Sequence, residues 1–323
     1  MKKNIFTQNP FCKLLGIKYP IIQGGMAWIS DATLAASVSE AGGLGIIAAM
    51  SSNGEHLRAQ IREAKKLTKK PFGVNIMLLS PHVDEVARVV VEEKISVITT
   101  GAGMPGKYMK DWVDAGIKVF PLASSVSFAK FLSRGGAAGI ICEGTEAGGH
   151  IGELTTMALV PQVCDALDLP IAAAGGIADG RGLAAAFALG ARAVQIGTRF
   201  LVAKECGIHQ NYKDKILKAK DSDTMVTGRR TGHPVRLLKT EFAREFLKIE
   251  ADTSLSDEDL LKLGSGALRL AAVEGNIEKG SFMAGQIAGL VKKEQTCAEI
   301  IEEIVNDAEK IFKTLNNIKG EEL

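Results

Sequence analysis

The chain has 323 residues, 46% of them hydrophobic, which is enough to bury the core of one large domain or of two ordinary ones. Its 39 basic and 37 acidic residues leave a net charge of +2, and this balance argues against a nucleic-acid binder. The five cysteines are widely spaced with no CxxC pair for zinc or redox exchange, as expected of reduced thiols. The sequence has no apolar signal core and no stretch of about 20 apolar residues, so we expect a cytoplasmic protein that does not span a membrane.

Short runs of β-branched and apolar residues alternate with helical patterns between residues 20 and 200. This alternation is typical of strand–helix–strand units around a parallel sheet. Strands are predicted at residues 21–23, 45–48, 73–77, 97–100, 118–122, 139–142, 171–174 and 193–196. Helices are predicted between them, for example at 31–40, 55–67, 82–92 and 126–133, with Asp31 as an N-cap. Eight such units favour a (β/α)8 TIM barrel, an α/β fold, with a doubly wound open sheet as the alternative.

The pattern changes after the eighth predicted strand. Residues 204–280 show no strand signal, but they contain charged helical segments at 212–220, 239–249 and 256–263. We therefore expect a helical lid inserted after the eighth strand, with helices at 286–292 and 297–315 completing the outer ring. The predicted domains are a barrel made of residues 1–203 and 281–323, and a lid or substrate subdomain made of residues 204–280.

A glycine-rich loop at residues 142–152 follows the sixth predicted strand and contains His150. Glycine has no Cβ, so the backbone of such a loop can approach a flat ligand closely. The histidine can exchange a proton near neutral pH, and Glu143 and Glu146 lie on the same loop. The alternative is a structural histidine that only braces the loop through hydrogen bonds.

Glycines also follow the last two predicted strands, at the end of the barrel where functional groups gather. Gly175, Gly176 and Gly197 can expose backbone N–H groups there, and Thr198 adds a hydroxyl. This pattern predicts a phosphate site, with ordinary turn glycines as the alternative.

Two amide side chains, Asn75 and Gln195, occur at strand ends, where apolar side chains would normally fill the barrel. An amide supplies both donors and an acceptor, as the edge of a heterocycle requires, although each residue alone fits a satisfied buried amide equally well. Together with the phosphate site, they favour a planar phosphorylated cofactor. Flavin mononucleotide (FMN) fits better than a dinucleotide because no GxGxxG motif follows the first strand.

Seven strings along the chain resemble a single family. They are QGGMAW (23–28), PFGVNIMLLSP (71–81), TTGAG (99–103), EGTEAGGHIGELTTM (143–157), AAGGIADG (173–180), QIGTRF (195–200) and SFMAGQIAGLV (281–291). They resemble the flavin-dependent enoyl-acyl-carrier-protein reductases, the type II bacterial enoyl reductases, within the wider nitronate monooxygenase family. The resemblance covers essentially the whole chain. It implies a barrel that holds FMN, accepts hydride from NADH or NADPH, and reduces trans-2-enoyl thioesters in fatty-acid elongation.

The resemblance also implies roles for single residues. His150 matches the family's proposed catalytic histidine, which would donate to the thioester oxygen or to the α-carbon, with water as the alternative proton source. The residues that match the family's cofactor contacts are Gly25, Met26, Ala27, Asn75, Glu143, Gly175, Gly176, Gln195, Gly197, Thr198, Met283, Ala284 and Gln286. The first dozen residues extend past the usual family start and are expected to contribute little.

The resemblance further implies a homodimer and a substrate carried by an acidic acyl carrier protein. From residue 204 to residue 244 the chain has 10 Lys and Arg against 5 Asp and Glu. Such an excess is usually a solvated face, but the resemblance makes it a candidate docking surface for the carrier, with Arg229 and Arg230 as the residues to test. His209 and His233 in the same segment are candidate substrate contacts.

Two other functions stay open at this point. A nitronate monooxygenase would share the FMN barrel and the EAGGHIG loop but would act on an alkyl nitronate with oxygen, whereas the VNIMLLSP and MAGQIAGLV strings favour the reductase. A flavin-binding regulatory barrel without turnover is the alternative from a different functional class. The sequence does not distinguish NADH from NADPH, because no dinucleotide-binding motif offers a residue that would report the choice.

Overall fold

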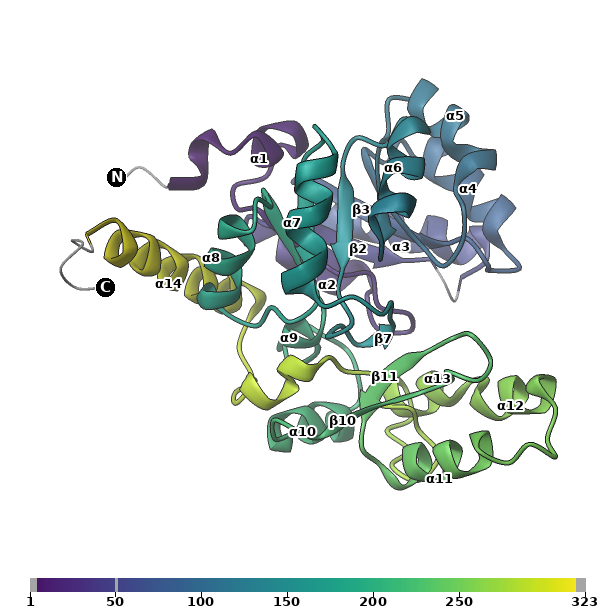
Figure 1. Ribbon diagram of the computed structural model, residues 1–323. Coiled ribbons are helices and arrows are strands. Elements are labelled where there is room, and N and C mark those ends of the chain that lie inside the picture. The colour runs from purple at the N-terminus through teal and green to yellow at the C-terminus, as the bar shows by residue number, and fades with distance from the viewer. Residues whose placement is uncertain (1–4, 50–51, 318–323) are drawn as a thin grey trace.

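Eight parallel strands form the centre of the protein in its computed structural model, which describes residues 5–49 and 52–317 (Figure 1). Their order is β1-β9-β8-β6-β5-β4-β3-β2. The strands are β1 (Ile21–Gln23), β2 (Gly45–Ala48), β3 (Phe72–Met77), β4 (Val97–Gly101), β5 (Lys118–Ala123), β6 (Ile140–Glu143), β8 (Ile171–Ala174) and β9 (Ala193–Ile196). The predicted strands agree with these bounds to within one residue at each end.

The sheet closes on itself between β1 and β2. Leu44, just before β2, forms a parallel bridge with Ile22 of β1. The Leu44 N–H donates to the Ile21 carbonyl at 2.8 Å, and the Gln23 N–H donates to the Leu44 carbonyl at 3.0 Å. The predicted TIM barrel is therefore confirmed, and the doubly wound open sheet is excluded.

Helices cover the outside of the barrel. They are α2 (Ala32–Glu40), α3 (Gly54–Leu67), α4 (Val83–Glu92), α5 (Gly106–Asp114), α6 (Val126–Arg134), α7 (Thr156–Ala166), α8 (Gly180–Ala188) and α14 (Cys297–Asn317). Asp31 caps α2, as predicted, by accepting a hydrogen bond from the Leu34 N–H at 2.9 Å. The C-terminal helix α14 packs beside α8 and α2, so it completes the outer ring (Figure 1). Among the described helices, none is long and apolar enough to cross a membrane.

The amino-terminal end of the barrel is covered by α1 (Pro10–Leu15), which follows a short turn of helix, η1 (Ile5–Gln8). The Phe11 ring is fully buried, with its centroid 5.2 Å from that of Phe120. It belongs to a core cluster with Val97 and Ala193, the first residues of β4 and β9. The expectation that the first dozen residues contribute little is therefore wrong for the part that the structure describes; residues 1–4 lie outside it.

Residues 204–280, which we call the insert, lie on one side of the barrel (Figure 1). The helices of the insert are α10 (Gln210–Lys218), α11 (Glu241–Glu250), α12 (Asp257–Gly264) and α13 (Ala267–Ala272). The insert also contains an antiparallel hairpin of β10 (Thr224–Thr227) and β11 (Val235–Leu238), and β11 pairs in turn with β7 (Gly149–His150). The prediction that the insert contains no strand is wrong; one partner of this hairpin, β7, comes from a distant loop, so its pairing has no local signal.

Candidate active site

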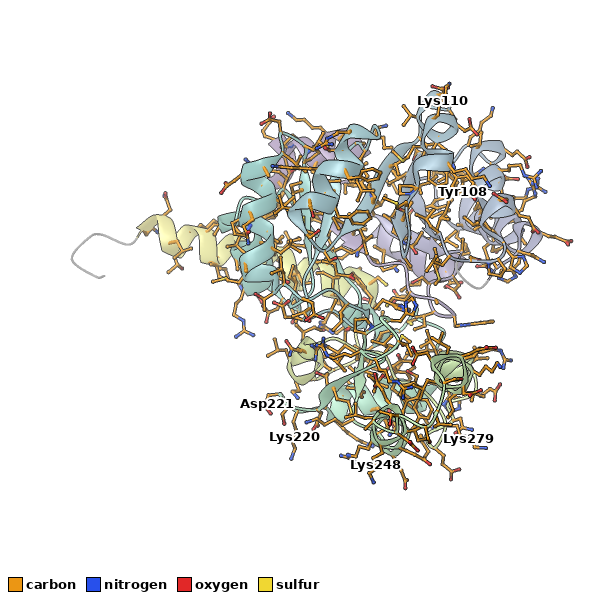
Figure 2. The ribbon with its side chains drawn as sticks, turned by 45° about the vertical axis from the view of Figure 1, so that its right-hand side comes forward. Tyr108, Lys110, Lys220, Asp221, Lys248 and Lys279 are labelled. Carbon is orange, nitrogen blue, oxygen red and sulfur yellow. The ribbon has the colours of Figure 1, made fainter. Side chains whose placement is uncertain are left out.

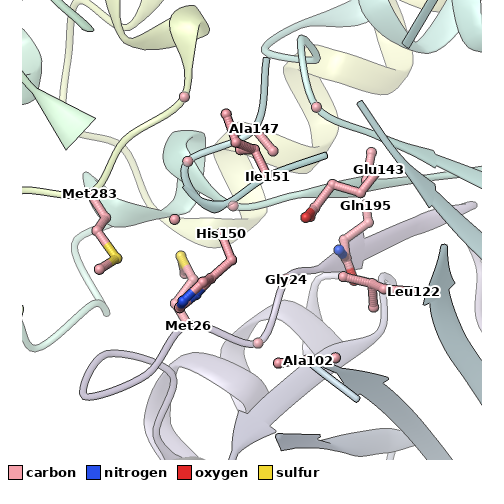
Figure 3. A pocket seen from close by; sticks show the side chains of 18 of the residues that line it. Gly24, Met26, Ala102, Leu122, Glu143, Ala147, His150, Ile151, Gln195 and Met283 are labelled. Carbon is pink, nitrogen blue, oxygen red and sulfur yellow. The ribbon is translucent and has the colours of Figure 1, made fainter. Parts of the chain in front are cut away.

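A cavity of about 470 Å³ opens at the carboxyl ends of the barrel strands, where TIM barrels place their active sites. Its walls come from the loops after β1, β3, β6, β8 and β9, from residues 232–234 of the insert, and from the segment around residues 283–287. Its volume lies in the range of small-molecule and cofactor sites. Figure 3 shows Met26, His150 and Met283 on one side of the cavity, and Glu143 and Gln195 on the other.

Twelve of the fourteen predicted site residues line this one cavity. They are Gly25, Met26, Ala27, Asn75, Glu143, His150, Gly175, Gly176, Gln195, Gly197, Thr198 and Met283. The other two do not: Ala284 is fully buried against Gly148, and Gln286 is exposed. Their neighbours Met283 and Gly285 line the cavity instead.

One end of the cavity has a wall made of backbone, which we call the glycine wall and define as Gly175, Gly176 and Gly197. The φ angles of Gly175 and Gly176 are +87° and +74°, a backbone conformation that residues with a side chain rarely adopt. Glycine suits both positions, and the wall carries no Cβ atom there. Gly197 comes directly before the short helix α9 (Thr198–Leu201). The Thr198 hydroxyl accepts a hydrogen bond from the Gly285 N–H at 2.9 Å, which leaves its own proton available to a ligand. These donors suit a phosphate group.

Three polar side chains face the middle of the cavity. The Asn75 amide donates to the Thr99 hydroxyl at 2.8 Å, which fixes the orientation of the amide. The Gln195 Oε1 is buried and has no hydrogen-bond partner within the described part of the chain. Burial raises the pKa of Glu143 to about 8, so this carboxyl group is protonated near neutral pH and can donate a hydrogen bond. Figure 3 shows Glu143 and Gln195 facing the same space.

This set of groups fits FMN. A buried acceptor without a partner costs about 1–3 kcal/mol, so the Gln195 Oε1 requires a donor from a ligand, and the edge of a flavin ring carries an N–H. The protonated Glu143 and the Asn75 amide are donors suited to ring carbonyl oxygens. The glycine wall and Thr198 would hold the phosphate at the other end.

His150 lies where the insert meets the cavity. Its backbone is held by pairing with Val235 of β11, while its side chain is exposed to the open cavity. The pKa of His150 is lowered, mainly by the surrounding protein and further by the nearby His233. Its imidazole is therefore neutral near neutral pH, and one ring nitrogen can donate a hydrogen bond while the other accepts one.

The glycines of the loop after β6 bring protein segments close together. A Cβ on Gly144 would lie 2.2 Å from Thr156 Oγ1, and one on Gly148 would lie 2.6 Å from the carbonyl carbon of Ala284. Glu146 is also occupied by protein, since its carboxylate accepts hydrogen bonds from the Thr156 N–H at 2.9 Å and from the Thr156 hydroxyl at 3.0 Å. The loop is therefore shaped by packing against the barrel as much as by the cavity.

Several cavity residues are not among the predicted site residues. Leu79, Ala102, Ser124, Phe128, Ile151, Pro234, Leu268 and Ile287 are examples. Most are apolar residues on separate loops, and only the fold brings them together. Of the two histidines considered as substrate contacts, His233 lines the cavity, whereas His209 caps α10 by accepting a hydrogen bond from the Asn211 N–H at 3.1 Å.

Comparison with known proteins identifies a family that matches most of the chain. The chain matches the family described as nitronate monooxygenase over residues 8–89 and 82–307. It is 34% identical to a probable nitronate monooxygenase of Staphylococcus saprophyticus, over 93% of this chain and 97% of that protein. It is 33% identical to the (3aS,4S,5R,7aS)-5-hydroxy-7a-methyl-1-oxo-octahydro-1H-indene-4-carboxyl-CoA dehydrogenase of Rhodococcus jostii, over 95% of this chain and 98% of that protein.

Among solved structures, FabK from Thermotoga maritima superposes on the chain with a TM-score of 0.93. The two sequences are 48% identical, and the match covers 96% of this chain and 99% of that one.

Proposed function

The chain belongs to the nitronate monooxygenase family, whose members are FMN-dependent oxidoreductases, and we propose that within this family it is an enoyl thioester reductase. The observation that carries the proposal is the likeness to FabK, a type II enoyl-acyl-carrier-protein reductase, over nearly the whole of both chains. In the proposed reaction, NADH or NADPH supplies the reducing equivalents, and a trans-2-enoyl thioester accepts them.

The residues of the cavity would hold FMN at both of its ends. The glycine wall with the Thr198 hydroxyl would bind the phosphate, and Asn75, Glu143 and Gln195 would bind the ring edge. When bound, FMN supplies the two-electron chemistry that side chains do not provide. The chain's own residues then have to orient the ring and the substrate and to handle the proton.

His150 would act on the substrate. Reduction of an enoyl thioester develops negative charge on the carbonyl oxygen and requires a proton at the α-carbon. A neutral imidazole can donate its N–H in a hydrogen bond to that oxygen, and an imidazole that has first taken up a proton can deliver it to that carbon. His150 lines the cavity beside Met26 and Met283 (Figure 3).

The remaining wall of the cavity suits an acyl chain. Met77, Leu79, Leu122 and Phe128 line it from the sides of β3 and β5, and they give this part of the cavity an apolar surface. A thioester with its acyl chain would cover these side chains. The resemblance to the reductase family adds that the acyl group arrives on an acyl carrier protein, in fatty-acid elongation, and that the protein works as a homodimer in the cytoplasm.

Nitronate monooxygenase is the second candidate function. The matching family and the relative from Staphylococcus saprophyticus carry that name, and His150 and the same cavity would serve an alkyl nitronate. A small nitronate would leave the apolar surface of the cavity unfilled, which favours the reductase.

Anaerobic mixing tests the proposal. The purified protein should carry about one FMN per chain, since the cavity has a single glycine wall for a phosphate. NADH or NADPH should bleach the flavin band, and a crotonyl thioester should restore it without oxygen. Restoration only with oxygen, together with turnover of an alkyl nitronate, would support the monooxygenase instead. A flavin that no nicotinamide bleaches would support a binding protein without turnover.

A further inference from the structure

A second imidazole, that of His233, lies beside His150 in the same cavity. The two ring centroids are 6.5 Å apart, and the ring planes are nearly perpendicular at 87°. His233 lies on the turn between β10 and β11, so it comes from the insert, whereas His150 comes from the loop after a barrel strand. The proposed function as argued so far assigns a role only to His150.

The backbone fixes how the two histidines lie relative to each other. Val235 of β11 pairs with His150 of β7, and the Ile151 N–H donates to the Pro234 carbonyl at 3.1 Å. His233 directly precedes this paired stretch. Both imidazoles are therefore attached to one small antiparallel sheet, and a movement of the hairpin would move His233 with the strand that holds His150.

The turn that carries His233 is also hydrogen-bonded to a buried carboxyl group, that of Glu250. The His233 N–H donates to the Gly228 carbonyl at 3.0 Å. Glu250, at the end of α11 and only 7% exposed, accepts hydrogen bonds from the Gly228 N–H at 2.9 Å and from the Arg230 N–H at 2.8 Å. A turn held at three points positions its side chain more tightly than an ordinary surface loop does.

We propose that His233 is a second hydrogen-bond donor for the proposed reductase reaction, and that it holds the thioester carbonyl oxygen together with His150. An oxygen hydrogen-bonded to a ring nitrogen lies about 4 Å from the ring centroid, so rings 6.5 Å apart leave room for one oxygen bonded to both. As the double bond is reduced, an electron pair moves onto this oxygen, and two preorganised N–H donors stabilise the charge. His233 and His150 both keep their protons in this step, and the α-carbon takes its proton from water.

The hydrogen-bonding capacity of an imidazole fits this role. A neutral imidazole has one N–H, so the pair supplies two donors and retains one acceptor nitrogen on each ring. The pKa of His150 is lowered by the surrounding protein and by the neighbouring His233, which disfavours the charged form of His150. The inference rests on the proposed function, because an enolate oxygen arises only in the reduction of the thioester.

The test compares His233→Ala, His233→Gln, His150→Ala and the double alanine variant in the two half-reactions, followed by rapid mixing. His233→Ala should slow the reoxidation of the flavin by a crotonyl thioester by about 10²-fold, the usual effect of losing one such donor. His233→Gln keeps a side-chain N–H and should recover most of the rate. Bleaching by NADH and the FMN dissociation constant should not change. The double variant should lose less than the product of the two single losses, because both residues act on one oxygen.

Three results would overturn the inference. The first is an unchanged enoyl half-reaction in His233→Ala, and the second is a parallel loss of FMN affinity and of both half-reactions, which would mean a structural role. The third is a loss in His233→Gln equal to that in His233→Ala. Wild-type protein that bleaches with NADH but never reacts with the thioester would instead overturn the proposed function, and the inference with it.

Discussion

Within the cavity, the polar side chains divide into those held by protein and those left for a ligand. Glu146 uses its carboxylate to hold Thr156, so it braces the loop. Glu143, on the same loop, faces the cavity with a raised pKa, and Gln195 has an acceptor without a partner. The sequence predicts that both glutamates lie near the site, but it cannot tell their roles apart, because the role depends on which neighbours the fold brings within hydrogen-bonding distance.

The first prediction concerns His150. His150→Ala should still bind FMN and should still be bleached by NADH, because reduction of the cofactor develops no charge on a thioester oxygen. Reoxidation by a crotonyl thioester should slow by about 10²-fold or more if the histidine is a general acid. His82→Ala, which removes a partly exposed histidine from the start of α4, is the matched control. Equal losses in both half-reactions, with weaker FMN binding, would show that His150 only braces the loop.

The second prediction concerns the pH dependence of stability. Burial raises the pKa of Glu143 from 4.5 to about 8 in the folded protein. Between these values the unfolded chain has released the proton and the folded protein retains it, so this group lowers the free energy of unfolding as pH rises. Glu143→Gln removes the titration, so the apoprotein variant should gain stability relative to wild type between about pH 5 and about pH 8.

Urea unfolding of the two apoproteins at several pH values measures this gain. Glu55→Gln, which changes an exposed carboxyl group at the start of α3, is the control and should show no such trend. A difference between Glu143→Gln and wild type that stays constant with pH would mean that Glu143 is already ionised in the folded protein.

At the scale of elements, the sequence predicts those whose signal is local in the chain and misses those whose partners lie far away in the chain. Each barrel strand is an apolar run followed by its own helix, so its signal is local, and all eight strands are predicted. The β10–β11 hairpin is missed because β11 pairs with β7, far away in the sequence, and the hairpin lies outside the regular alternation of barrel strands and helices. The importance of α1 is missed for the same reason, since its partners are the first residues of distant strands.

The third prediction concerns α1. Phe11 is fully buried against Phe120 at the amino-terminal end of the barrel, away from the cavity. Phe11→Ala should lower the free energy of unfolding by about 3–5 kcal/mol, since it leaves a cavity in a packed core. Lys13→Ala, on the exposed face of the same helix, should have little effect. Chemical denaturation measures both changes, and a loss below about 1 kcal/mol for Phe11→Ala would show that α1 is not part of the core.

At the scale of the whole molecule, the basic residues of the insert are less available than their number suggests. Arg229 forms an ion pair with Glu153 at 2.7 Å. Arg230 donates to the Asp252 carbonyl at 2.7 Å and pairs with Asp257 at 3.1 Å. Reversing these two arginines would disturb the turn that holds His233, so they are unsuitable for testing the docking of a carrier protein.

Exposed lysines at the end of α10 are better candidates. Lys218 and Lys220 are both exposed, and Figure 2 shows Lys220 at the outer surface of the insert. The Lys292 ammonium, from the segment after the short helix η2 (Gln286–Leu290), donates to the Ala219 carbonyl at 3.0 Å, so a third positive charge lies beside them. We call Lys218, Lys220 and Lys292 the lysine patch. Ile287 of η2 lines the cavity, and Lys292 comes just after η2 in the chain, so one short element lies between the lysine patch and the site.

The last prediction tests this patch with Lys218→Glu/Lys220→Glu. An acidic carrier protein would interact with the charge on the surface of the insert, whereas a short uncharged thioester would contact only the cavity. KM should therefore rise for an enoyl-carrier substrate and not for a short uncharged crotonyl thioester. The rise should shrink at high salt, because exposed charges are screened beyond about 10 Å at 0.1 M ionic strength. Lys69→Glu/Lys70→Glu, just before β3 at the opposite end of the barrel, makes the same change in net charge and should leave both KM values unchanged. Equal effects of the two double variants would mean that only net charge matters, and no effect of either would place the docking surface elsewhere.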